Sequence, residues 1–276
     1  PAIITRRGAA ARLSLVRNLP LEEYRYAKSV AKVPAKVTIL GPDRIAQRFK
    51  WETSLNVYKG LDDFVEHIVA IERQMIAELV KAGCKYIQID APGYTAYVDK
   101  VSLARMRARG EDPERNFQRS IDADNALIAG FPGVTFGIHI CRGNARTIDP
   151  QTGKLVPQWH REGTYDAIAE KLFNSLKHQR LLLEYDSERA GGFEPLRLVP
   201  KDKLVVLGLV STKNSDMETV DDLKRRIDQA SKYLPIGQLA LSPQCGFGGI
   251  DSKVLSENEM WRKLDTIVET AKQVWS

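Results

Sequence analysis

Apolar residues recur along this chain in two patterns, as short continuous runs and as longer stretches with helical spacing. The short runs are rich in valine, isoleucine and leucine, and they are apolar on both alternating faces, which is typical of strands in a covered parallel sheet. They span residues 35–41, 84–90, 134–140, 180–186, 203–210 and 238–243. Strands that alternate with helical stretches in this way indicate βαβ units.

The stretches between these runs carry apolar residues three or four positions apart, so each predicts an amphipathic helix. Those helices span residues 61–82, 112 to about 129, 164–176, 218–233 and 256–274. Gly83 suits the left-handed residue that commonly follows a helix. Asp112, Thr164 and Ser256 are of types that cap helix N-termini, and a glutamate three positions after Ser256 completes a capping box.

Six strands with helices between them predict an α/β fold of the (β/α)8 TIM-barrel type. Two short apolar runs at residues 2–5 and 11–16 could supply further strands. Because a closed barrel needs eight, we expect a barrel that lacks its first strand, with residues missing before Pro1. No linker, repeat or low-complexity segment divides the sequence, so residues 1–276 are expected to form a single domain.

Composition is that of a soluble globular protein, with 43% hydrophobic and 28% charged residues. The formal net charge is +6, but the cations are spread out, and the densest group, Arg105, Arg107 and Arg109, has acidic residues close behind it. We therefore expect a solvated surface and no nucleic-acid partner. No apolar run approaches the ~18 residues of a membrane span, and the N-terminus lacks the apolar stretch of a signal peptide. Three cysteines cannot all pair, which favours a reducing, cytoplasmic location, with a transit peptide as the alternative.

Metal-binding residue types lie at the ends of three predicted strands. His139 and Cys141 end the run 134–140, Glu184 lies near the end of 180–186, and Cys245 follows 238–243. Barrel enzymes place their chemistry at the C-terminal ends of strands, and residues two apart on a strand project to the same side. One imidazole, two thiolates and one carboxylate suit tetrahedral Zn²⁺ far better than calcium or magnesium.

Each member of this set also has a purely structural interpretation. His139 and Cys141 could be buried core residues, and Cys245 could be a packed thiol. Glu184 could form an ion pair across strand ends, since it follows three leucines and an unpaired carboxylate would be costly there. Cys84, after a helix and a glycine, is expected to pack as a small core residue.

Other strand ends offer candidates for substrate binding. Asp90 ends the run 84–90 and could bind the ammonium of an amino-acid substrate, or could cap a helix or pair with an arginine. Gln88 and Ser211 are further candidates for substrate contact, and Lys213 is the candidate catalytic residue, placed to meet negative charge. We expect His67 and His178 to pack structurally. The polar segment 146–163, with His160, reads as a loop over the barrel mouth.

At these residues the chain resembles the catalytic C-terminal barrel of cobalamin-independent methionine synthase. The matching stretches are VTILGP at 37–42, IQIDAP at 87–92, HIC at 139–141, LLLEYDS at 181–187 and LSPQCG at 241–246. The likeness covers nearly the whole chain from about residue 20. It implies that zinc is bound by His139, Cys141, Glu184 and Cys245, and that Asp90 contacts the amino group of homocysteine. The family transfers a methyl group from methyltetrahydrofolate to the homocysteine thiolate.

The chain departs from the family pattern at several points. Ala91 replaces the glutamate of the usual IQIDEP motif, and Lys213 stands where the family carries a histidine thought to donate a proton. The first barrel strand, with its Gly-Ser turn, and the separate N-terminal barrel have no counterpart. The segment 146–163 resembles an insertion. These features are similar to those of shorter, single-barrel relatives.

The resemblance predicts a zinc-dependent methyltransferase whose partners are a small-molecule thiol, homocysteine, and a methyl donor such as a folate. No membrane partner is expected, and the oligomeric state is open, with a homo-oligomer as one option. Three alternatives remain: alkylation of another thiol, as in the joining of coenzyme M to epoxides; a metal-free, decarboxylase-like barrel; and a non-catalytic zinc-binding paralogue.

Overall fold

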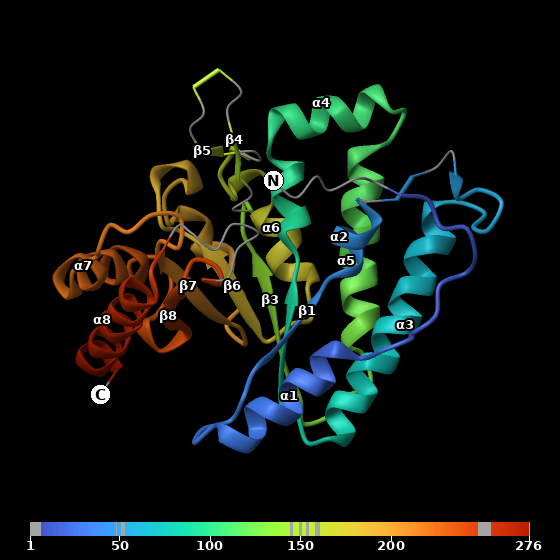
Figure 1. Ribbon diagram of the computed structural model, residues 1–276. Helices are drawn as coiled ribbons and strands as arrows, with labels where there is room; N and C mark the ends of the chain where they lie inside the picture. Colours follow the sequence, from blue (N-terminus) through green and yellow to red (C-terminus); the bar gives the residue numbers. More distant parts are fainter. Residues whose placement is uncertain are drawn as a thin grey trace.

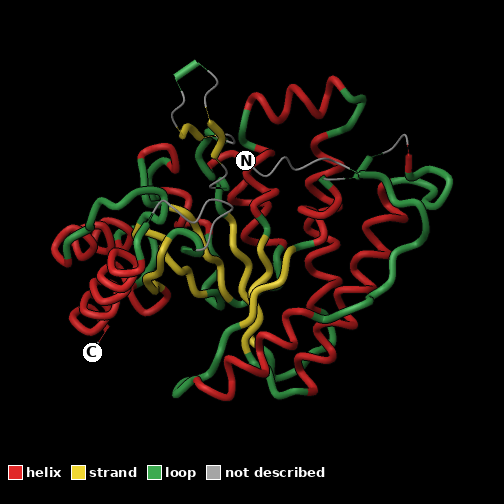
Figure 2. Tube along the Cα trace, viewed as in Figure 1, coloured by secondary structure: helices red, strands yellow, loops and turns green. Residues whose placement is uncertain are grey.

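The computed structural model describes residues 7–47, 49–50, 53–143, 146–148, 151–152, 155–157, 161–247 and 255–275. Six parallel strands form one sheet in the order β1-β2-β3-β6-β7-β8 (Figures 1 and 2). They are β1 (Val37–Leu40), β2 (Tyr86–Asp90), β3 (Thr135–Ile140), β6 (Arg180–Glu184), β7 (Leu204–Val210) and β8 (Leu239–Pro243). All six strands predicted from the sequence are confirmed, because each apolar run is long enough for a strand and is bounded by polar or turn residues.

Helices follow the strands and cover the outer face of the sheet (Figure 1). The α-helices are α1 (Leu19–Val30), α2 (Pro42–Ala46), α3 (Leu61–Lys81), α4 (Lys100–Ala108), α5 (Pro113–Ile128), α6 (Asp166–Ser175), α7 (Val220–Ser231) and α8 (Glu257–Trp275). Short 3₁₀ helices are η2 (Pro92–Tyr97), η3 (Glu188–Ala190), η4 (Glu194–Leu198) and η5 (Ile236–Gln238). In the part of the chain that is described, no helix is both long and apolar enough to cross a lipid bilayer.

Most of the predicted helix ends are also correct. Gly83 has φ of +94°, and the N–H of Cys84 donates to the Leu79 carbonyl at 3.0 Å, which closes α3. Asp112 caps α5 by accepting from the backbone N–H of Glu114. Ser256 forms the capping box with its glutamate. The predicted Thr164 cap is wrong: Tyr165 precedes α6, and its side chain makes no capping hydrogen bond.

Several elements differ from the sequence expectations. Residues 11–16 form no strand, and residues 2–5 lie outside the described residues. Helices α1 and α4 were not predicted, because each buries only one or two apolar side chains and so lacks a clear stripe. The expected loop 146–163 contains an antiparallel hairpin of β4 (Arg146–Ile148) and β5 (Leu155–Pro157). Among the described residues the sheet provides six strands of the barrel, and no ladder joins β8 to β1.

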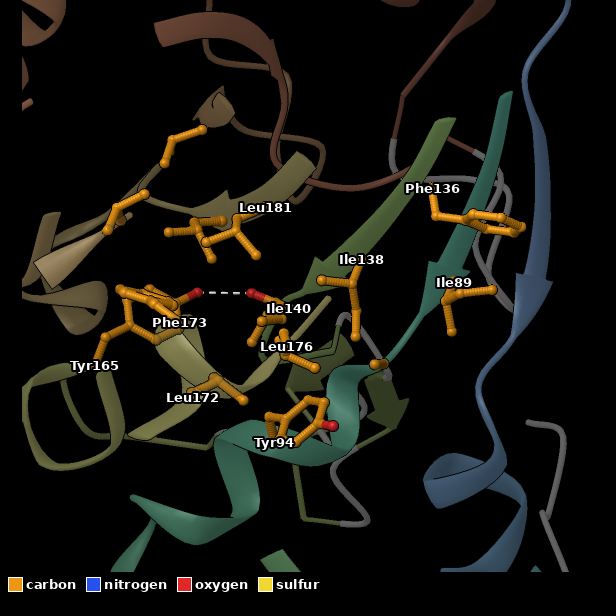
Figure 3. Close-up of a cluster of buried hydrophobic side chains, with 14 of the residues drawn as sticks. Ile89, Tyr94, Phe136, Ile138, Ile140, Tyr165, Leu172, Phe173, Leu176 and Leu181 are labelled. Carbon is orange, nitrogen blue, oxygen red and sulfur yellow. Dashed lines mark hydrogen bonds between the residues drawn. The ribbon is translucent and has the colours of Figure 1, made fainter. Parts of the chain in front are cut away.

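The core lies between the sheet and the surrounding helices. Ile138 and Leu181 on neighbouring strands are fully buried and face Leu172 and Phe173 of α6 (Figure 3). At the edge of this cluster the Tyr165 hydroxyl donates to the Ile140 carbonyl at 2.6 Å, the dashed line in Figure 3. The apolar packing of α6 and the end of β3 are therefore linked by a polar contact. Cys84, with 1% exposure, belongs to the same core, as predicted.

Two buried carboxylates interrupt the apolar interface between α3 and α5. Glu72 on α3 is 4% exposed and Asp124 on α5 is fully buried. The Tyr94 hydroxyl donates to Asp124 Oδ2 at 2.6 Å, whereas Glu72 Oε2 has no partner among the described residues. Burial, with the Asp124 charge nearby, raises the pKa of Glu72 to about 9. Glu72 is therefore protonated at neutral pH.

This arrangement makes the free energy of unfolding depend on pH. In the unfolded chain Glu72 regains an ordinary pKa near 4.5, so the unfolded state releases its proton first as the pH rises. The contribution of Glu72 is intact below that value and is lost up to about pH 9, by at most about 1.4 kcal/mol per pH unit. We expect Glu72→Gln to flatten this slope and to raise the free energy of unfolding at pH 8. Urea unfolding at pH 5 and pH 8 measures the effect, with exposed Glu66→Gln on the same helix as control. Equal slopes in all three proteins would contradict the prediction.

Candidate metal centre

Three of the four predicted ligands converge at the C-terminal edge of the sheet. His139 lies near the end of β3, Cys141 follows that strand, and Cys245 follows β8. Their ligand atoms all lie within 4.8 Å of one another. Donors at the usual Zn–S and Zn–N bond lengths stand roughly 3.5 Å apart around a tetrahedral ion, so a small contraction would complete this site. The donor set and its spacing fit zinc.

Gln244 holds the Cys245 segment against the rest of the site. Its side chain is 1% exposed, and its Oε1 accepts from Thr212 Oγ1 at 2.7 Å and from the Thr212 N–H at 3.2 Å. Its backbone N–H donates to the Val210 carbonyl at 2.8 Å. Its own carbonyl oxygen lies 2.9 Å from His139 Nε2. Cys245 is thus positioned by the residue directly before it.

Gly208 on β7 makes room for this segment. A Cβ added at Gly208 would lie 2.8 Å from Gln244 Cα and 2.8 Å from the Leu183 carbonyl oxygen. Sequence reasoning missed both Gly208 and Gln244 as positioning residues. A glycine inside the otherwise apolar run 203–210 was the available signal, since such a glycine often marks a close backbone approach.

Asp90 pairs with His139. Its Oδ1 lies 2.6 Å from His139 Nδ1, and the two residues are direct partners in the β2–β3 ladder. A carboxylate on one imidazole nitrogen fixes the ring orientation and makes the other nitrogen a better metal ligand. The sequence analysis considered a substrate ammonium, a helix cap or an arginine, and the partner in the structure is His139. The Asp90 side chain is still 30% exposed, so it can also be reached from solvent.

The cluster favours charge separation between its members. A hydrogen bond from Cys245, together with the neighbouring His139, lowers the pKa of Cys141, and the same hydrogen bond raises the pKa of Cys245. Burial disfavours protonated His139, but the Cys141 thiolate and Asp90 outweigh burial, so the pKa of His139 is raised. Cys141 is therefore the thiolate of the pair, stabilised by the imidazolium and by the Cys245 thiol.

Glu184, the fourth predicted ligand, is fully buried and lies outside this group of three. Its Oε1 accepts from Arg189 Nη2 at 2.8 Å and from Lys213 Nζ at 2.9 Å. Its Oε2 accepts from the backbone N–H of Arg142 at 2.7 Å. Burial alone would raise the pKa of Glu184, but Lys213 and Arg189 outweigh it and lower the pKa to about 2. The structure thus shows the ion pair that was the structural alternative for this residue.

The remaining predicted site residues are held by local partners. Lys213 Nζ also donates to the two oxygens of Asp186, at 2.7 and 2.8 Å. Ser211 donates its N–H to Glu218 at 2.8 Å, and its Oγ accepts from the Lys213 N–H at 3.2 Å. Lys213 and Ser211 therefore lie beside Glu184, at the same edge of the sheet as the cluster.

Gln88 and two of the remaining histidines lie away from the cluster. Gln88 Oε1 accepts from the ammonium of Lys36, which precedes β1, at 2.6 Å, so its amide is directed toward the opposite end of the strands. His67 Nδ1 lies 2.9 Å from the Tyr58 hydroxyl. His178 is fully buried, and burial lowers its pKa to about 3. Both histidines pack structurally, as predicted, and His160 lies outside the described residues.

Comparison with known proteins gives named relatives. The chain is 38% identical over 260 residues to the uncharacterized protein YxjG of Bacillus subtilis (strain 168), covering 92% of this chain and 66% of that protein. YxjH of the same strain is 32% identical over 268 residues, with coverages of 96% and 68%. Methionine synthase of Saccharolobus solfataricus is 27% identical over 260 residues, with coverages of 92% and 63%. The chain thus spans about two thirds of the length of these relatives. No family model matches it.

Solved structures show the same relationship. The putative vitamin-B12 independent methionine synthase from Listeria monocytogenes matches with a TM-score of 0.72 at 25% identity, over 97% of this chain and 73% of that one. A B12-independent methionine synthase from Shewanella sp. W3-18-1 matches with a TM-score of 0.68 at 19% identity, over 94% and 67%, which supports the fold alone. Sequence relatives, fold and motifs agree, and the chain belongs to the cobalamin-independent methionine synthase family.

Proposed function

We propose that this chain is a zinc-dependent S-methyltransferase that methylates the thiol of homocysteine to give methionine. The observation that carries the proposal is the convergence of His139, Cys141 and Cys245 within 4.8 Å at the edge where barrel enzymes place their chemistry. Membership of the methionine synthase family supports the reaction type. The substrates are then a small thiol and a methyl donor.

His139, Cys141 and Cys245 would hold the zinc, and Glu184 was the fourth ligand predicted from the sequence. When bound, zinc lowers the pKa of a coordinated thiol, so that the sulfur is a thiolate and a nucleophile near neutral pH. Two thiolates and an imidazole are the donors that zinc prefers among protein side chains.

The chain's own residues orient the donors and the substrate. Asp90 fixes the ring of His139 through Nδ1, and its exposed part is available to a substrate ammonium group. Gln244 holds the Cys245 segment through Thr212. Lys213 lies on the same edge and contributes positive charge beside Glu184 and Asp186. We place the enzyme in a reducing, cytoplasmic compartment, because all three of its cysteines are free thiols.

The zinc assignment is tested by metal content. We expect one zinc per wild-type chain after dialysis, and Cys245→Ser should weaken zinc binding by more than about 100-fold, the upper end of what a residue behind the ligands contributes. Chelator competition measures the dissociation constants. Cys84→Ser is the matched control, because Cys84 is buried in the core away from the cluster. Equal zinc affinity in wild type and Cys245→Ser would remove Cys245 from the set.

The substrate assignment is tested with a panel of thiols and donors. Homocysteine should be methylated by methyltetrahydrofolate or methylcobalamin, and activity should disappear with a chelator and return with zinc. Coenzyme M with small epoxides, assayed in parallel, covers alkyl transfer to another thiol. Activity that survives complete removal of zinc would contradict the proposal and favour a metal-free barrel enzyme.

The positioning role of Gly208 has its own test. In Gly208→Ala the added methyl must displace either Gln244 or the Leu183 carbonyl, so we expect a loss of about 1–3 kcal/mol in the free energy of unfolding, as for other overpacked cores. Zinc affinity should also fall, because Cys245 follows the displaced residue. Urea unfolding and chelator competition measure the two effects. Gly237→Ala, where an added Cβ meets nothing within 4 Å, should change neither.

A further inference from the structure

The acceptor sites of the Glu184 carboxylate are largely filled by partners within the chain. Oε1 accepts three hydrogen bonds, from Arg189 Nε at 3.2 Å, from Arg189 Nη2 at 2.8 Å and from Lys213 Nζ at 2.9 Å. Oε2 accepts one, from the Arg142 N–H at 2.7 Å. A carboxylate offers about four lone-pair sites, so these four donors leave little capacity for a metal bond.

The cations that hold Glu184 are themselves anchored. The Lys213 and Arg189 side chains are 20% and 13% exposed, and Lys213 is fixed from its other side by Asp186, whose side chain is 1% exposed. The four groups carry two positive and two negative charges, so the network is neutral as it stands. Moving Glu184 onto a metal would leave the two cations with one carboxylate between them, in a region where charges are poorly solvated.

Charge balance at the cluster leads to the same conclusion. A divalent zinc with the thiolates of Cys141 and Cys245 and neutral His139 is already neutral. Adding the Glu184 carboxylate would make the centre negative before any substrate arrives. A centre held by three protein donors remains neutral and keeps its fourth position for the sulfur of a thiolate.

The contact from Glu184 to Arg142 gives this carboxylate a different task. Arg142 directly follows Cys141, so the bond from its N–H to Oε2 fixes the backbone that carries the thiolate. The Arg142 guanidinium, 1% exposed, lies 4.7 Å from the Tyr165 ring and donates to the Gly163 carbonyl at 2.6 Å. The segment after β3 is therefore fixed through both the backbone and the side chain of Arg142.

We propose that Glu184 is a positioning residue held away from the metal by Arg189 and Lys213, so that His139, Cys141 and Cys245 alone bind zinc and the fourth position receives the substrate thiol. This inference rests on the proposed function. It assigns Lys213 to holding Glu184, in place of the catalytic role predicted from the sequence. It also means that no protein ligand has to leave the metal when the thiol binds.

A crystal structure of the zinc-loaded full chain, with the metal located by anomalous scattering, tests the proposal directly. We expect Glu184 to keep its contacts with Arg189 and Lys213, and the fourth position to carry solvent. A Glu184 oxygen within about 2.2 Å of the zinc, the length of a metal–carboxylate bond, would overturn the proposal. Zinc absent from the His139, Cys141 and Cys245 cluster would overturn the proposed function as well.

Thiol binding in solution gives a second measurement. In cobalt-substituted protein, the absorption bands report the entry of a sulfur ligand on titration with homocysteine. Glu184→Gln retains an amide oxygen for the Arg142 N–H, and in our proposal no carboxylate leaves the metal. Its thiol dissociation constant should therefore stay within about threefold of the wild-type value, which is under 0.7 kcal/mol. If Glu184 were a ligand that the thiol must displace, Glu184→Gln would bind the thiol more than about tenfold tighter, and the proposal would fail.

Two further variants separate this role from general damage to the fold. Glu188→Gln changes an exposed glutamate four residues along the chain and should alter neither zinc nor thiol binding. Lys213→Met removes one of the two cations that hold Glu184, and Lys213→Arg restores a cation. We expect a changed cobalt spectrum in Lys213→Met and recovery of the wild-type spectrum in Lys213→Arg. An unchanged spectrum in Lys213→Met would show that Lys213 does not control the metal surroundings, contrary to the proposal.

Discussion

The parallel pairing of strands is the constraint on which the candidate site depends. Asp90 and His139 are direct partners across the β2–β3 ladder, and Glu184 pairs with Gly208 across β6–β7. Because all six strands run in the same direction, residues at the end of each run reach one edge, although they are as many as 105 positions apart in the chain. A slip of one residue in any of these ladders would turn the chemical side chains toward the helices.

Electrostatic pairing keeps this edge of the sheet intact. The site contains buried or nearly buried acids, cations and thiols, and each is placed against a group of complementary character. Asp90 lies on His139, Lys213 lies between Glu184 and Asp186, and the Cys245 thiol serves the Cys141 thiolate. Buried charges are stable only when they are paired in this way. The exception is the interface of α3 and α5, where Glu72 meets the demand by remaining protonated.

Much of the fold could be predicted from the sequence, because the strand runs and the long helices have strong periodicity. Helix α4 could not, since Met106 is its only buried side chain. For the site, the residue types at strand ends correctly brought together His139, Cys141 and Cys245. The relation of Glu184 to that group depends on Arg189 and on Lys213, which is 29 residues away, and hydrophobic patterning carries no information about such pairs. The same holds for Gln244 and Thr212, 32 residues apart.

The hydroxyl of Tyr165 makes assembly of the site inseparable from assembly of the core. It donates to the Ile140 carbonyl on β3 and accepts from the Glu184 N–H on β6 at 3.1 Å, while its ring packs with Phe173 of α6. A chain in which α6 has not docked lacks this bridge between the two strands that carry His139 and Glu184. The donor atoms are therefore brought into place late, when the interior closes. A metal ion encountered earlier, during synthesis or refolding, would find scattered thiols rather than a preformed cradle.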